Sequence, residues 1–143
     1  MNSNLSAGSK FEREFCQLLA DNGFWVHRVA QNVGGQQPAD IIAIKNHYHA
    51  LVDCKVVSTS KGFSFDRVED NQAMAMDMFE QKCCEVGWFA LKLPSGKIEM
   101  LSLWQILNHE NNGRHSISTA ELESGKYTSS VEGWIRRAAK LWM

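Results

Sequence analysis

The stretch PADIIAIKNHYHALVDCK, residues 38–55, decides the fold of this 143-residue chain. Residues 41–44 are a short run rich in β-branched side chains, and residues 50–57 are a second strand-like run. The polar segment 46–49 between them is short enough to connect an antiparallel hairpin. The sequence therefore predicts two neighbouring strands, the first of which begins at an acid.

This hairpin determines where three charged side chains point. Alternate residues of a strand share a face, so Asp53 and Lys55 face one way with residues 51 and 57, while residues 50, 52, 54 and 56 face the other way. Asp40 opens the first strand just after a proline, where an extended chain lets a side chain overhang the sheet edge. We therefore expect two acids and a lysine to meet at one place.

Asp40, Asp53 and Lys55 together predict a metal site. Clustered carboxylates repel one another and need a compensating cation, and oxygen ligands favour a hard ion such as magnesium. A lysine beside that ion is suited to positioning the attacking water or stabilising charge on a phosphate. The predicted reaction is metal-assisted hydrolysis of a phosphodiester.

Three short motifs stand in a fixed order along the chain, namely Gly8-x-x-Phe11-Glu12-Arg13-Glu14, Pro38-Ala39-Asp40 and Asp53-x-Lys55. In this order the sequence resembles the PD-(D/E)xK nuclease superfamily, in particular the Holliday junction resolvases of the archaeal and RecU-like groups. The similarity runs from about residue 6 to 88 and continues weakly through residues 112–117. It implies an α/β fold: a restriction-endonuclease-like core with a central mixed β-sheet flanked by helices, in the order α-β-β-β-α-β, followed by short C-terminal helices.

The resemblance also implies roles for single residues. Glu12, Asp40 and Asp53 are the expected acids of the site, Lys55 is the expected catalytic lysine, and the carbonyl of Cys54 is an expected extra metal ligand. The expected cofactor is magnesium, with manganese as the alternative. Helix geometry separately favours Glu12 over Glu14, because at 100° per residue Glu12 lies roughly 50° and Glu14 roughly 110° from the centre of the apolar stripe.

A second predicted helix, over residues 67–86, contributes Gln72. Its apolar face is made of residues 68, 75, 76, 79, 83 and 86, and Gln72 projects into the middle of that face. A buried amide must find hydrogen bonds, so Gln72 is either tied to backbone or directed at a polar site. Superfamily members often carry a glutamine at this place, which makes Gln72 a candidate supporting residue.

The charge balance offers no general attraction for DNA, since the net charge is -1 and the pI is about 6.5. Local clusters of basic residues must supply that attraction, although each one is individually also explained as a solvated surface charge. Arg28 matches a basic residue of the archaeal resolvases. The candidates for DNA binding are Lys10, Arg13, Arg28, Lys61, Arg67 and Arg114, and more weakly Arg136, Arg137 and Lys140.

Composition predicts one ordinary globular domain, with 44% hydrophobic and 22% charged residues. We expect a single nuclease domain over residues 1–143, with a catalytic core at about 6–101 and a C-terminal helical extension at about 102–143. No leader, membrane span or metal knuckle is recognised, and buried reduced thiols are expected, which predicts a cytoplasmic location in a bacterial or phage-infected cell.

The leading functional prediction is a magnesium-dependent endonuclease that acts on branched DNA, most simply a homodimeric resolvase of four-way junctions in recombination and DNA processing. The C-terminal tryptophans, Trp134 and Trp142, are either core or a dimer surface. One alternative is a restriction- or repair-type endonuclease on the same fold, because fold does not fix substrate. Another is a non-catalytic DNA-binding protein. The chain departs from the RecU-like pattern in lacking room for the stalk insertion, and Asp53 stands where many relatives have glutamate.

Overall fold

The computed structural model describes residues 6–29 and 39–140, the last two of these without their side chains. Pro38, the first position of the Pro38-Ala39-Asp40 motif, and Trp142 lie outside the described residues. Within the described residues, no helix is long and apolar enough to cross a membrane.

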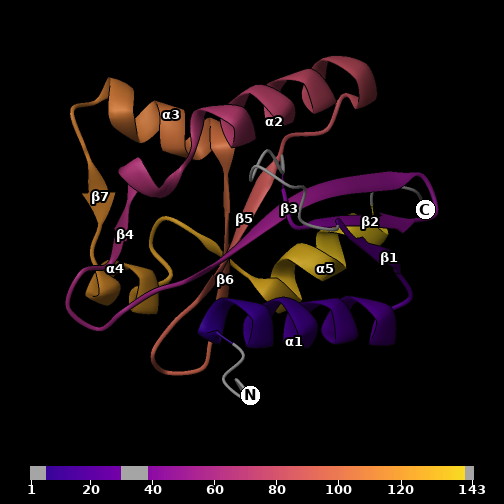
Figure 1. Ribbon diagram of the computed structural model, residues 1–143, viewed down its shortest axis with the longest axis horizontal. Helices are drawn as coiled ribbons and strands as arrows, with labels where there is room; N and C mark the ends of the chain where they lie inside the picture. Colours follow the sequence, from indigo (N-terminus) through magenta and orange to yellow (C-terminus); the bar gives the residue numbers. More distant parts are fainter. Residues whose placement is uncertain (1–5, 30–38, 141–143) are drawn as a thin grey trace.

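In the described part of the chain, six strands form one mixed sheet (Figure 1), in the order β1-β2-β3-β5-β6-β8. Only the central pair β3 and β5 is parallel among these neighbours, and every other pair is antiparallel. This arrangement confirms the expected mixed α/β sheet. The strands are β1 (Trp25–Arg28), β2 (Ile41–Lys45), β3 (Tyr48–Val56), β5 (Trp88–Lys92), β6 (Ile98–Ser102) and β8 (Ser129–Ser130).

The predicted hairpin is formed by β2 and β3, with Ile41 opposite Val52 and Ala43 opposite Ala50. Its turn is tighter than expected. Asn46 adopts the left-handed conformation, with φ of 55°, and closes the turn together with His47. Tyr48 and His49, which were expected in the connection, are therefore the first residues of β3.

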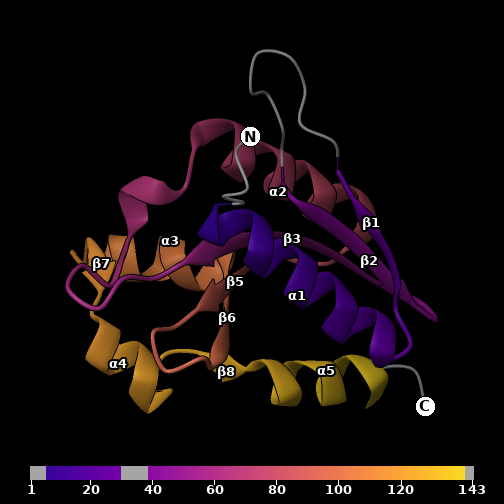
Figure 2. The same ribbon diagram turned by 60° about the horizontal axis from the view of Figure 1, so that its bottom comes forward.

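Two helical layers cover the two faces of the sheet (Figure 2). Helices α1 (Ala7–Asp21) and α5 (Val131–Lys140) pack on one face, where Val52 and Cys54 join the apolar core. The other face, which carries Leu51 and Val57, forms a second core with the remaining elements. The predicted alternation of β3 is thus confirmed. The elements on the face with Leu51 and Val57 are β4 (Phe63–Ser64), η1 (Phe65–Arg67), α2 (Asp70–Cys83), α3 (Leu103–Asn111), β7 (Ser116–Ile117) and α4 (Thr119–Ser124).

Helix α2 is shorter than predicted. It begins after the N-cap Glu69, because a 3-10 turn precedes it, and it ends where Cys84 adopts the left-handed conformation with φ of 60°. Cys83 and Cys84 are exposed, so the expectation of buried thiols is wrong for both, and Cys83 does not lie on a core face as predicted. Met76 is fully buried, as the apolar stripe predicted.

Two helices of the C-terminal third begin at serine N-caps. Ser102 caps α3 and Ser118 caps α4, each through a capping box with the residue three positions later. Trp134 of α5 is 2% exposed and stacks on Phe24, with ring centroids 6.0 Å apart. Trp134 is therefore core, which settles for this residue the choice between core and dimer surface.

Candidate active site

Asp40 and Asp53 are brought together by the β2–β3 hairpin. The Asp40 backbone N–H donates to the Val52 carbonyl at 3.2 Å, which extends the pairing of the two strands by one residue. The Asp40 side chain then reaches along β3, where its Oδ2 accepts the backbone N–H of Cys54 at 2.8 Å. The hydrogen bond from the Cys54 N–H therefore fixes the Asp40 carboxylate beside Cys54, the residue that follows Asp53.

Asp53 is an almost completely buried acid, 1% exposed. Its Oδ2 lies 3.1 Å from Lys55 Nζ, and its Oδ1 accepts a hydrogen bond from Gln72 Nε2 at 3.0 Å. Oδ2 is buried, and the Lys55 ammonium is its charged partner. A carboxylate oxygen can accept a further partner beside the lysine.

The environment of Asp53 opposes its ionisation. The pKa of Asp53 is raised from 3.8 to about 7, mainly by burial and next by the nearby Asp40 carboxylate, while Lys55 opposes this rise. A metal ion bound here would favour the ionised form by the same electrostatic rule. Burial is thus the main cost of ionising Asp53 when only protein groups are counted.

Gln72 is held in one orientation by α2 itself. Its Oε1 accepts the backbone N–H of Glu69 at 3.2 Å as part of the capping box of the helix. The amide nitrogen is therefore left pointing at Asp53. Sequence reasoning placed Gln72 on the buried face and proposed either a structural or a site-directed role, and in this geometry one side chain does both.

Glu12 and Glu14 differ as their helix positions predicted. The Glu12 side chain is 22% exposed and pairs with Arg28 at 2.8 Å, whereas the Glu14 side chain is 47% exposed and pairs with Lys92 at 2.7 Å. Burial raises the pKa of the Cys54 thiol, and Asp40, Asp53 and Glu12 add to that rise in decreasing order. All three predicted acids therefore raise the pKa of the same thiol, that of Cys54.

The donor set fits a hard divalent cation in part. Asp40 and Asp53 offer carboxylate oxygens, and the Cys54 carbonyl belongs to the residue between Asp53 and Lys55. Within residues 6–29 and 39–140, no three His, Cys, Asp or Glu side chains lie in a ready metal-binding cluster. The Glu12 carboxylate is engaged by Arg28, whereas Asp40 accepts the Cys54 N–H and Asp53 pairs with Lys55.

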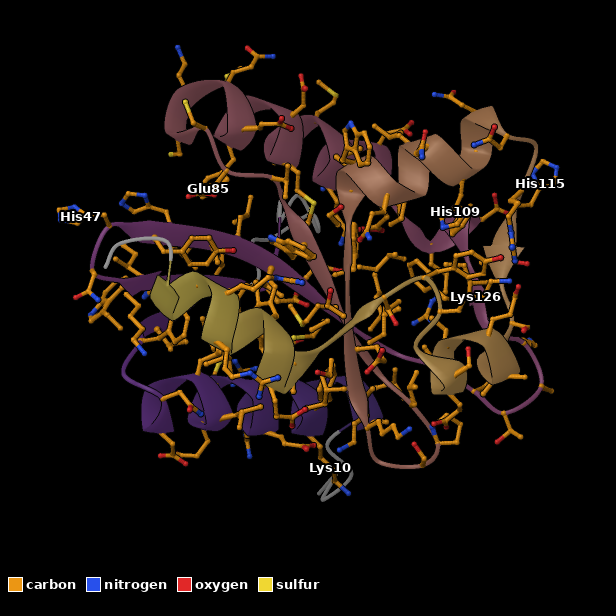
Figure 3. All side chains as sticks on the ribbon, turned by 180° about the vertical axis from the view of Figure 1, so that it is seen from behind. Lys10, His47, Glu85, His109, His115 and Lys126 are labelled. Carbon is orange, nitrogen blue, oxygen red and sulfur yellow. The ribbon has the colours of Figure 1, made fainter. Side chains whose placement is uncertain are left out.

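Five of the predicted DNA-binding residues fall into two groups. Lys10, Arg13 and Lys61 are exposed, and Lys10 projects from the start of α1 (Figure 3). Arg28 and Arg114 are engaged in ion pairs, Arg28 with Glu12 and Arg114 with Glu121 at 2.7 Å.

Arg67 occupies a position that sequence reasoning missed. Its Nη1 donates to the Val56 carbonyl at 2.8 Å, at the end of the strand that carries Lys55, and its guanidinium lies over the Phe63 ring. Burial lowers the pKa of Arg67, and the charge of Asp53 opposes that shift. Arg67 therefore supports the end of the strand that carries Lys55. No local sequence pattern predicts such a contact across eleven residues.

The model of the archaeal Holliday junction resolvase (Hjc) family matches residues 3–131. The chain is 28% identical over 127 residues to the crossover junction endodeoxyribonuclease Hjc of Sulfurisphaera tokodaii, covering 87% of this chain and 85% of that protein. It also superposes on Archaeoglobus fulgidus Hjc, a Holliday junction resolvase, with a TM-score of 0.56 and 20% identity over 68% of this chain and 78% of the other. The last similarity is evidence for the fold.

Proposed function

Because the chain belongs to the archaeal Holliday junction resolvase family, we propose that it is a structure-selective endonuclease that hydrolyses phosphodiester bonds in four-way DNA junctions. The observation that carries the proposal is the convergence of Asp40, Asp53 and Lys55 at one end of the β2–β3 hairpin. A buried carboxylate beside a second acid is costly to ionise unless an ion or a substrate compensates its charge.

The family implies dependence on a divalent metal ion, and we propose magnesium as that ion, with manganese able to replace it. Asp40, Asp53 and the Cys54 carbonyl would hold it. When bound, magnesium supplies positive charge to the scissile phosphate and lowers the pKa of a coordinated water. Glu12 would join these ligands only after exchanging its partner Arg28, which then becomes free to contact a DNA phosphate.

The remaining steps belong to the side chains. Lys55 orients the attacking water and stabilises the negative charge that develops on the phosphate. Gln72 keeps the Asp53 carboxylate in place through its single hydrogen bond, and α2 in turn fixes Gln72. Lys10, Arg13 and Lys61 are the exposed basic residues that we assign to the DNA backbone.

We also propose that two chains act together, because a four-way junction presents two equivalent strands to be cut. Of the large apolar side chains that are exposed in the described residues, four lie on adjacent α2 and α3, among them Met74 at 72% and Trp104 at 62%. The groove between them is rimmed by Asp77 and Glu80, whose charges disfavour DNA. This face is therefore the proposed dimer contact, and Met78→Glu is expected to shift the mass in solution from dimer to monomer in light scattering.

Two alternatives are separated from the main proposal by substrate. Labelled four-way junction, flap and linear duplex should each be incubated with the protein in magnesium or in EDTA. Paired symmetric nicks in the junction support the resolvase. Preferred cutting of the flap or duplex supports a repair- or restriction-type nuclease, and binding without cutting supports a non-catalytic DNA-binding protein.

A matched pair of variants sharpens this experiment. Glu12→Gln should reduce junction cutting, whereas Glu14→Gln, two residues away on the same helix and paired with Lys92, should not. Equal loss in both variants would show that helix stability, rather than the site, is affected. The setting of a bacterial or phage-infected cytoplasm stays a prediction.

A further inference from the structure

Trp25 and His27 are aromatic residues of the edge strand β1 that the candidate active site does not use. The residues that alternate with them, Val26 and Arg28, face α1, where Val26 packs against the core and Arg28 pairs with Glu12. Trp25 and His27 therefore point to the opposite face of the sheet. Both residues are exposed, Trp25 at 60%. Their rings form an aromatic surface outside the two apolar cores.

The two rings lie parallel to each other. Their planes differ by 6° and their centroids are 6.0 Å apart, because side chains two residues apart on a strand stand next to each other on one face. The imidazole of His27 thus stacks beside the Trp25 indole and limits its rotation. Most of the indole remains exposed, so another flat ring can lie against it.

The register of the strands connects this pair of rings with the candidate active site. His27 lies opposite Ile42 of β2, and Ile42 lies opposite Leu51 of β3, so the three side chains share one face. Asp53 follows two residues after Leu51 and shares that face. Two strand spacings of about 4.8 Å and two residues of about 3.3 Å place the His27 Cα roughly 12 Å from the Asp53 Cα. A DNA strand with a phosphate at Asp53 therefore reaches Trp25 within a few nucleotides.

The charges on this face are compatible with DNA. Asp53 is the one acid among the outward residues of β1, β2 and β3, and the proposed metal ion would compensate its charge. The α2 acids Asp77 and Glu80 lie in the groove with α3 instead. A polyanion thus meets less repulsion here than on the α2–α3 face. The outward residues are Trp25, His27, Ile42, Ile44, His49, Leu51, Asp53 and Lys55.

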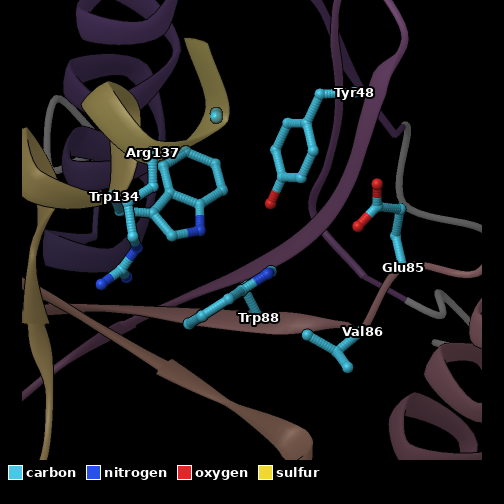
Figure 4. Close-up of a pocket in the computed structure, with 7 residues that line it drawn as sticks. Tyr48, Glu85, Val86, Trp88, Trp134 and Arg137 are labelled. Atoms are coloured by element: carbon cyan, nitrogen blue, oxygen red, sulfur yellow. The ribbon is translucent and has the colours of Figure 1, made fainter. Parts of the chain in front are cut away.

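The other tryptophans of the described residues are placed differently. Trp88 and Trp134 meet edge-on, with centroids 6.0 Å apart, and line a cavity beside α5, where core packing uses their rings (Figure 4). Trp104 is 62% exposed but lies on α3, on the apolar face that we assign to the dimer contact. Among these tryptophans, Trp25 alone is both exposed and on the sheet face that carries Asp53.

A flat, exposed indole beside a nuclease site is suited to a base, since every base has a π-face that stacks on an aromatic ring. Inside a duplex each base is stacked on both faces, whereas at the branch point of a junction the stack is interrupted. We propose that Trp25, supported by His27, stacks on a base at the branch point and thereby positions the strand whose phosphate lies at Asp53. The inference rests on the proposed function, because the junction supplies both the base and the scissile phosphate.

The fluorescence of 2-aminopurine, a base analogue that is quenched when it stacks on an aromatic ring, tests this contact. The analogue is placed at the branch point of a four-way junction, and the full-length protein is added in EDTA, so that binding is observed without cutting. The wild type and Trp25→Phe, which keeps an aromatic ring, should quench the signal, whereas Trp25→Ala should not. His115→Ala is the matched control, because it removes an exposed ring next to β7, in the separate two-stranded sheet.

Binding affinity gives a second measurement on the same variants. Trp25→Ala should weaken binding to the junction about tenfold, the loss expected for one stacked base. Its binding to linear duplex should be unchanged, because the interior of a duplex exposes no base face. A selective loss of this kind separates stacking from a general contribution of Trp25 to folding, which would weaken both complexes.

Several results would overturn the proposal. These are the absence of quenching by the wild type, undiminished quenching by Trp25→Ala, equal losses of affinity for junction and duplex, or a shift of Trp25→Ala from dimer to monomer in light scattering, which would assign the ring to a second chain. Neither measurement involves cleavage, so the contact and the proposed function fail separately. Junction cutting in magnesium without quenching would remove the contact alone. Quenching that depends on Trp25 in a protein that cuts no DNA would support the contact and count against the proposed function.

Discussion

Gln72 on α2 donates a hydrogen bond of 3.0 Å to Asp53 on β3, so a helix outside the sheet holds a carboxylate of one of its central strands. We predict that Gln72→Glu keeps the capping box, because glutamate is equally suited to that position, but removes the donor and adds a negative charge beside Asp53. Since the pKa of Asp53 is already raised to about 7, a further rise moves the pH of half-maximal cutting upwards.

The measurement for this prediction is the pH dependence of junction cleavage between about pH 6 and 9, a window centred near the raised pKa of Asp53. Gln81→Glu is the control, because Gln81 also donates to an aspartate, Asp77, but on the exposed side of α2. A Gln72→Glu profile that coincides with the profile of Gln81→Glu would rule out a positioning role for Gln72.

Asp53 should make the metal-free protein less stable as the pH rises. Its pKa is about 7 in the folded chain and about 4 when unfolded, so the folded state binds more protons in that interval. The contribution of Asp53 to the free energy of unfolding is fully present below about pH 4 and is lost as the pH rises through about 7. It amounts to about 1.4 kcal/mol per pKa unit of difference between the folded and unfolded states.

Asp53→Asn removes this titration while keeping an oxygen for Gln72. In EDTA the variant should therefore melt at a higher temperature than the wild type at pH 8, and the gap should shrink towards pH 5. Thermal unfolding followed by circular dichroism measures both. Added magnesium should raise the melting temperature of the wild type more than that of the variant, and a variant that is less stable than wild type at pH 8 would contradict the assigned burial cost.

The site was predictable from the sequence where it depends on local periodicity. A strand repeats every two residues, so the shared face of Asp53 and Lys55 followed from the sequence alone, and the helical repeat placed Gln72 on the buried side of α2. The helix end was not predictable in the same way, because Cys84 leaves the helix before the periodic pattern stops, and Cys83 consequently faces solvent.

Contacts between distant segments were the main omission. Arg28 pairs with Glu12 across sixteen residues, and Arg67 reaches the Val56 carbonyl from a 3-10 turn. The strands β4 and β7 are two residues each, too short for any alternation to reveal them. Such contacts depend on how elements pack, which a single sequence does not encode in a repeat.

Arg67 and Lys61 should behave differently although both were predicted to bind DNA. Arg67→Ala loses a hydrogen bond from a charged, half-buried group and should lower the free energy of unfolding by about 1–3 kcal/mol. Lys61→Ala should leave stability unchanged, because Lys61 is exposed, but should reduce the salt dependence of junction binding by about one phosphate contact. Urea denaturation measures stability, and junction binding at several salt concentrations measures the phosphate contacts. A changed salt slope with unchanged stability in Arg67→Ala would show that Arg67 contacts DNA rather than supporting the fold.

Lys55 should be required for cutting but not for binding. Lys55→Met keeps the apolar stem and removes the charge that lies 3.1 Å from Asp53, so the cleavage rate should fall by about a hundredfold or more while junction affinity changes little. Loss of this charge also leaves Asp53 without its nearest cation, which raises the pKa of that carboxyl further and makes metal binding the main source of compensation. Single-turnover cleavage and gel-shift binding on the same junction measure the two quantities, with Lys92→Met as the control because Lys92 pairs with Glu14. Parallel losses of cutting and binding in Lys55→Met would mean that the lysine serves DNA affinity rather than the chemical step.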